Sequence, residues 1–170
     1  MNTYERSVRV AAPLADVWDF HSRVDGLEAL TPNWLGLRVE EIRGPDGEPD
    51  PEVLTAGTAI HLSVRPGGFG PRQDWTTRIV ARDQSDGAAS FRDVMLDGPF
   101  PAWEHTHCFY RDGGGTVVRD VVDYELPLGG LGRRLGPLAV VGFEPMFRYR
   151  HRRTKALLEG DGPGAREGGD

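Results

Sequence analysis

The sequence is poor in cysteine, in long apolar runs and in positive charge, and each shortage excludes a class of protein. Cys108 is the only cysteine among 170 residues, so no internal disulfide can form and a cytoplasmic location is expected. No apolar run approaches the roughly 20 residues of a membrane-spanning helix. Residues 1–6 lack the apolar core of a signal peptide. The net charge of −6 argues against a nucleic-acid partner.

The length and composition fit one domain with a complete hydrophobic core. Hydrophobic residues make up 38% of the chain and charged residues 27%, which is ordinary for a globular protein. We therefore predict a single domain over residues 1–159. The tail, residues 160–170, is rich in glycine and charge and is predicted to be disordered.

Alternating apolar and polar residues, separated by turn clusters, predict seven strands joined by short connections and therefore an antiparallel sheet. Between the first and second strands, helical spacing and a proline at position 13 predict two short helices over residues 13–22 and 25–30. The second helix is expected to be capped by Asp25. The predicted strands cover residues 3–11, 37–43, 56–65, 72–82, 88–96, 102–111 and 116–126.

The last part of the domain predicts a long helix. Its expected inward stripe is Leu131, Leu135, Leu138, Gly142, Met146, Tyr149 and Leu157, flanked by Phe143 and Phe147. Prolines 137 and 145 interrupt this helix or mark its start. A long apolar helix must bury its stripe, and a curved sheet offers a concave face. The sequence thus predicts an α+β fold in which a seven-stranded curved sheet wraps around a C-terminal helix, with space between them.

Two histidines and two aspartates are predicted to share one otherwise apolar face. Side chains alternate across a strand, so His105 and His107 point the same way as Trp103. The turns on either side place Asp93 opposite His105 and Asp120 opposite His107. Buried charges need partners, so this cluster is the first place to look for function.

The histidine–aspartate cluster has three interpretations. An aspartate that orients a histidine forms a general acid or base, which makes His105, His107, Asp93 and Asp120 candidate catalytic residues. The same groups could contact a ligand, or simply form a buried network that fixes strand register. A metal is not expected, because no third histidine is placed on this face, and no cofactor is predicted.

Aromatic and sulfur-containing side chains are candidate walls of a ligand cavity, since a pocket wall can also be core. The candidate ligand-binding residues are Trp18, Trp34, Trp75, Phe91, Met95, Trp103, Phe109, Tyr124, Phe143, Met146, Phe147 and Tyr149. The basic group Arg148, Arg150, Arg152, Arg153 and Lys155 is interpreted as a solvated end of the last helix, with a docking patch for an anionic head group or partner as the alternative.

Three segments resemble the SRPBCC superfamily, which includes polyketide cyclases/dehydrases, lipid-transfer domains related to the steroidogenic acute regulatory protein, and the birch pollen allergen. They are Val10–Phe20, Asp97–His107 and Phe143–Arg150. The second resembles a subgroup of small cyclase-like proteins, relatives of which occur fused to sugar-epimerase-like domains. The resemblance implies a helix-grip fold with a hydrophobic cavity between sheet and C-terminal helix.

The leading hypothesis is therefore a protein that binds a hydrophobic or aromatic small molecule in that cavity. One alternative is a cyclase/dehydratase-like enzyme in which His105 or His107 moves protons. The other is a regulatory module that acts through a protein partner. A closed pocket with a polar centre would favour the enzyme, and an exposed aromatic patch would favour the partner module. Fold alone does not decide among them.

Overall fold

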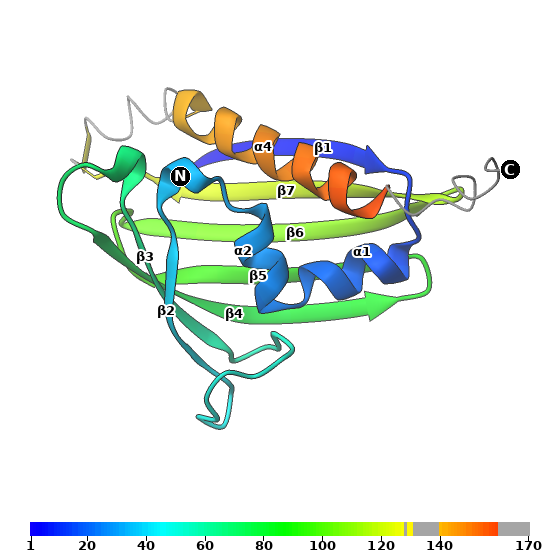
Figure 1. Ribbon diagram of the computed structural model, residues 1–170, viewed down its shortest axis with the longest axis horizontal. Helices are drawn as coiled ribbons and strands as arrows, with labels where there is room; N and C mark the ends of the chain where they lie inside the picture. The colour runs from blue at the N-terminus through cyan, green and yellow to red at the C-terminus, as the bar shows by residue number, and fades with distance from the viewer. Residues whose placement is uncertain (128, 131–139, 160–170) are drawn as a thin grey trace, which may run out of the picture.

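The protein is built on one antiparallel sheet, described here from a computed structural model that places residues 1–127, 129–130 and 140–159. The strand order is β1-β7-β6-β5-β4-β3-β2. The predicted α+β helix-grip fold is confirmed (Figure 1). The strands are β1 (Asn2–Val10), β2 (Arg38–Arg43), β3 (Ala59–Val64), β4 (Gln73–Ser85), β5 (Ala88–Asp97), β6 (Ala102–Asp112) and β7 (Gly115–Glu125).

The period-two pattern of the sequence explains which face of the sheet is covered. On β6, Trp103, His105, His107 and Phe109 are buried while the residues between them are more exposed. The predicted register is present: Asp93 pairs with His105 between β5 and β6, and His107 pairs with Asp120 between β6 and β7. The two histidines and two aspartates therefore share the concave face.

Two short helices follow β1. They are α1 (Leu14–His21) and α2 (Val24–Leu30), and a 3-10 turn, η1 (Asn33–Leu35), leads into β2. The expected cap at Asp25 is wrong, because α2 begins one residue earlier and its N-cap, Arg23, makes no side-chain capping bond. The two helices meet closely at Gly26, where an added Cβ would lie 2.1 Å from the carbonyl oxygen of Phe20.

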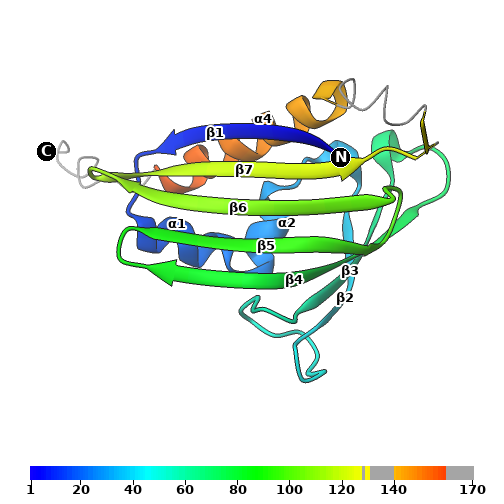
Figure 2. The same ribbon diagram turned by 180° about the vertical axis from the view of Figure 1, so that it is seen from behind.

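The C-terminal helix α4 (Val140–Leu158) crosses the concave face of the sheet. Figure 2 shows the strands in front of α1, α2 and α4, so these helices all lie on one face. Pro145 lies inside α4 and not at its start. A second 3-10 turn, η2 (Pro66–Gly68), connects β3 to β4.

The inward stripe of α4 differs from the predicted one. Phe143, Phe147, His151 and Thr154 are buried, whereas Gly142 and Leu157 are exposed and Met146 and Tyr149 are partly buried. The prediction counted apolar residues only, so it passed over a buried face that continues through a histidine and a threonine. Leu131, Leu135, Leu138 and the predicted disordered tail lie outside the described residues.

The hydrophobic core consists of three clusters that surround the space under α4. One joins α1 to β6 and β7 and contains Trp18 and Phe109. A second holds α4 against β1, β6 and β7 through Phe143 and Phe147. The third joins β2, β3 and β4 and includes Ile60. The site lies between the second and third clusters.

Candidate functional site

A cavity of about 150 Å³ lies between the concave face of the sheet and helices α2 and α4. Most of its wall is aliphatic or aromatic. The apolar lining residues are Leu27, Leu30, Leu35, Leu37, Leu54, Ile60, Leu62, Val64, Trp75, Ile79, Phe91, Trp103, Met146 and Phe147. The polar ones are His21, Thr31, Thr77, Asp93, His105, His107 and Arg150.

The structure divides the twelve candidate ligand-binding residues into two groups. Five line the cavity, namely Trp75, Phe91, Trp103, Met146 and Phe147. The other seven do not line it. Four of them are buried in the core, namely Trp18, Phe109, Tyr124 and Phe143, and Met95 packs against the core. Trp34 is 48% exposed, and Tyr149 is partly buried. Periodicity identified the concave face, but it could not tell which part of that face packs tightly and which stays open.

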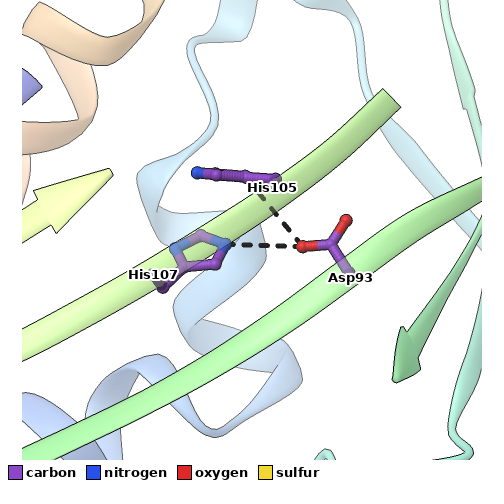
Figure 3. A group of neighbouring side chains, drawn as sticks. All are labelled: Asp93, His105 and His107. Carbon is purple, nitrogen blue, oxygen red and sulfur yellow. Dashed lines mark ion pairs between the residues drawn. The ribbon is translucent and has the colours of Figure 1, made fainter. Parts of the chain in front are cut away.

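Asp93, His105 and His107 face one another at the polar end of the cavity (Figure 3). Oδ2 of Asp93 lies 3.5 Å from Nε2 of His107 and 4.0 Å from Nδ1 of His105. The other carboxylate oxygen, Oδ1, accepts a hydrogen bond of 2.8 Å from the hydroxyl of Thr77 on β4. Thr77 therefore holds Asp93 so that one oxygen is directed at the two imidazoles.

Asp120 on β7 lies behind these residues, does not line the cavity, and is 3% exposed. Nε2 of His105 donates a hydrogen bond to Oδ1 of Asp120 at 2.8 Å, and Nε2 of His151 donates to Oδ2 at 2.6 Å. Nδ1 of His107 lies 3.0 Å from Oδ1, without the alignment of a hydrogen bond. The carboxylate of Asp120 is thus in contact with three imidazoles. The sequence had instead suggested one aspartate for each of His105 and His107.

The closest contacts in this cluster are diagonal, although the strand register is the expected one. His105 is paired with Asp93 in register but bonds to Asp120, and His107 lies nearer to Asp93 than His105 does. Diagonal neighbours on one face of a sheet lie within reach of long side chains. Register therefore predicted which residues meet, but not which atoms bond.

The electrostatics of the cluster follow from its burial and its carboxylates. Burial would lower the pKa of His107, but Asp120 and Asp93 outweigh it and raise that pKa. Burial and the neighbouring imidazole of His107 lower the pKa of His105. Burial would raise the pKa of Asp120, yet the three histidines hold it well below its usual value. At neutral pH the aspartates are ionised, and the protonated fraction of His107 is larger than that of His105.

Aromatic rings limit how a ligand can approach the histidines. Phe91 stacks on His107 with ring centroids 4.0 Å apart, and Phe147 meets His105 edge-on at 5.2 Å. The two imidazoles also lie against each other, with ring centroids 3.7 Å apart. Because these contacts restrict access to the ring faces, we expect a ligand to approach the histidines at their edges.

Two functional residues on α4 were missed or misplaced by sequence reasoning. His151 was not singled out, although Phe143, Phe147 and His151 recur every four residues on one helix face. Arg150 was assigned to a solvated basic end, which is wrong: it lines the cavity and is partly buried. Arg152 and Arg153, two and three residues further on, are exposed as expected.

Arg150 lines the cavity and has no partner for its guanidinium group in the part of the chain that the structure describes. None of the hydrogen bonds or ion pairs among the described residues involves its guanidinium group. Burial lowers the pKa of Arg150, and the nearby carboxylates of Asp120 and Asp93 act in the opposite direction. A guanidinium has five N–H donors and is always charged, so this one has unused capacity for an oxygen acceptor.

Comparison with known proteins agrees with this architecture. Residues 10–143 match the model of the family described as polyketide cyclase / dehydrase and lipid transport. The chain belongs to this family, and the SRPBCC resemblance is confirmed. No curated protein matches the sequence. Among the described helices, none has the length and hydropathy needed to cross a bilayer.

Solved structures show the same fold at low sequence identity. Norcoclaurine synthase from Thalictrum flavum, in complex with dopamine and hydroxybenzaldehyde, has a TM-score of 0.63 and 17% identity, covering 95% of this chain and 88% of the synthase. A START superfamily protein from Mycobacterium smegmatis has a TM-score of 0.58 and 17% identity, covering 91% and 98%. A nucleoside-diphosphate sugar epimerase from Corynebacterium glutamicum has a TM-score of 0.57 and 21% identity, covering 92% of this chain but 29% of the epimerase.

Proposed function

We propose that the protein binds a small hydrophobic, preferably aromatic molecule that carries an acidic oxygen group. The observation that carries this proposal is an apolar cavity lined in part by an arginine, Arg150, that has no hydrogen-bond or ion-pair partner among the described residues. Apolar lining favours a ring or chain, and the guanidinium favours a carboxylate or phenolate oxygen. The oxygen would lie beside the histidines.

The size of the cavity limits the ligand. An apolar cavity of about 150 Å³ is enough to take up benzene. The volume here is of the same order, so the buried part of the ligand is expected to be one or two rings. A bicyclic aromatic acid such as 2-naphthoate is therefore a suitable probe.

Proton transfer on such a ligand is a second candidate function, as in a cyclase or dehydratase. It is favoured by His107, whose Nε2 faces the cavity while Asp120 lies behind its Nδ1. A histidine supported in this way can accept a proton from a bound molecule and return it. For the protein-partner alternative, the exposed aromatic side chains among the described residues are Trp34, Phe69 and Tyr110.

Filling the cavity should weaken binding strongly without unfolding the protein. Met146 lines the cavity from α4, and Met146→Trp would place an indole where the ligand ring is expected. The measurement is the affinity for 2-naphthoate by isothermal titration calorimetry. We expect a loss of more than about tenfold, because overlap removes most of the apolar burial.

A tryptophan elsewhere on the same helix is the matched control. Val141 is 77% exposed on α4, so Val141→Trp should bind 2-naphthoate as the unmodified chain does. Equal affinity of the Met146→Trp variant and the unmodified chain would contradict the proposed site.

A further inference from the structure

The two cavity-facing histidines present one nitrogen each to the same carboxylate oxygen. One ring nitrogen of His105, one of His107 and an oxygen of Asp93 all lie within 4.8 Å of one another (Figure 3). A tetrahedral zinc ion with bonds of about 2.0 Å holds its ligand atoms roughly 3.3 Å apart. The two nitrogen–oxygen spacings, 3.5 and 4.0 Å, are close to that value, so small side-chain rotations would bring the oxygen into coordination distance.

The residues around this triad hold it in the manner of a metal site. Metal-binding histidines usually direct their second nitrogen at a carboxylate, which fixes the ring orientation. Here Nε2 of His105 donates a hydrogen bond to Oδ1 of Asp120 at 2.8 Å, and Nδ1 of His107 lies 3.0 Å from the same oxygen without the alignment of a hydrogen bond. Thr77 likewise fixes the free oxygen of Asp93 by bonding the other one. His105 and Asp93 thus each have a hydrogen-bonded supporting group, and His107 has Asp120 in close contact.

We propose that Asp93, His105 and His107 bind a divalent transition-metal ion such as Zn²⁺ or Fe²⁺. Two imidazoles and one carboxylate are ligands that suit these ions. The three ligands come from two neighbouring strands, β5 and β6, and all line the cavity. Coordination positions without a protein ligand would therefore open into the cavity, where the oxygen of a bound molecule could occupy one. The metal site itself does not depend on the proposed ligand.

This inference reverses the expectation drawn from the sequence, which set a metal aside for want of a third histidine. Asp93 was already expected on this face, and the structure brings one of its oxygens to 3.5 and 4.0 Å from the two histidines, with Asp120 behind them. His151 is the remaining imidazole of the cluster and bonds to the other oxygen of Asp120. It therefore supports the site from α4.

Titration with Co²⁺ tests the proposal, because Co²⁺ in a four- or five-coordinate site gives visible absorption bands much stronger than those of the hydrated ion. The untagged chain is first treated with a chelator and dialysed. We expect one Co²⁺ per chain, with bands that Zn²⁺ displaces. Loss of a supporting partner costs about 10–100-fold in metal affinity, so Asp93→Asn, which removes a direct ligand, should cost at least that much.

The control is a second histidine–aspartate pair, exposed on the outside of the sheet. His61 on β3 lies 3.8 Å from Asp74, and their side chains are 42% and 68% exposed. His61→Asn should leave the Co²⁺ bands and the affinity unchanged. A second measurement, which needs no variant, is the NMR spectrum of the imidazole groups. One equivalent of Zn²⁺ should shift the signals of His105 and His107 but not those of His61. Absence of the visible bands, or Zn²⁺ shifts confined to His61, would overturn the proposal.

Discussion

Replacing Asp120 by asparagine should lower the free energy of unfolding by about 3–5 kcal/mol, as expected when one partner of a buried ionic network is removed. The side chain is 3% exposed and accepts hydrogen bonds from His105 and His151, with His107 in contact. Asparagine has the same shape but loses the charge and turns an NH₂ group toward N–H donors. Urea unfolding at neutral pH with a chelator present measures the effect without any contribution from metal.

Asp123 provides the matched control, since it lies on the same strand and points to the other face of the sheet. It is partly exposed and accepts a hydrogen bond from Thr3. Asp123→Asn should change the free energy of unfolding by no more than about 0.5 kcal/mol. If the two variants were equally stable, Asp120 could not be the charged centre that holds α4 to the sheet.

Replacing Arg150 by methionine should separate ligand binding from stability. The guanidinium is partly buried with no partner among the described residues, so methionine should leave the free energy of unfolding unchanged or raise it by about 1 kcal/mol. The affinity for 2-naphthoate should fall about 10- to 100-fold, which is the contribution of hydrogen bonds to a charged group. The affinity for neutral 2-methylnaphthalene should stay the same. Calorimetry with the two probes gives both numbers.

The comparison variant is Arg153→Met, an exposed position on the same helix. It should bind both probes as the unmodified chain does, because surface charges on this face do not reach the cavity. An equal loss of affinity for both probes in Arg150→Met would show that Arg150 shapes the cavity and does not recognise an acidic group.

The fold could be predicted from the sequence because each strand is indicated by a pattern within its own residues. Alternation of apolar and polar residues, with a turn cluster at each end, locates a strand without reference to the rest of the chain. The short connections between strands then indicate an antiparallel sheet. The register of Asp93 with His105 followed from the turn between β5 and β6 in the same way. Each of these inferences needs only neighbours in the chain.

The site could be predicted only in part because its completion comes from α4, far away in the sequence. His151 and Arg150 look like members of a basic helix end, and only the packing of α4 on the sheet directs them at Asp120 and into the cavity. The prediction of the buried face of α4 was wrong for the same reason. It selected residues by their hydropathy and could not take account of the sheet residues that they contact. Which aromatic side chains border open space, as Trp75 does and Trp18 does not, depends on the fit of the whole core.

The most direct measurement of the central claim is an NMR titration of the four tryptophan indole N–H groups with 2-naphthoate. Trp75 and Trp103 line the cavity, whereas Trp18 is packed in the core beside Phe109 and Trp34 is largely outside. A ligand between the sheet and α4 should give large, saturable shifts for Trp75 and Trp103 and small ones for Trp18 and Trp34. Shifts dominated by Trp34, or no saturable shift at Trp75 and Trp103, would contradict binding in this cavity.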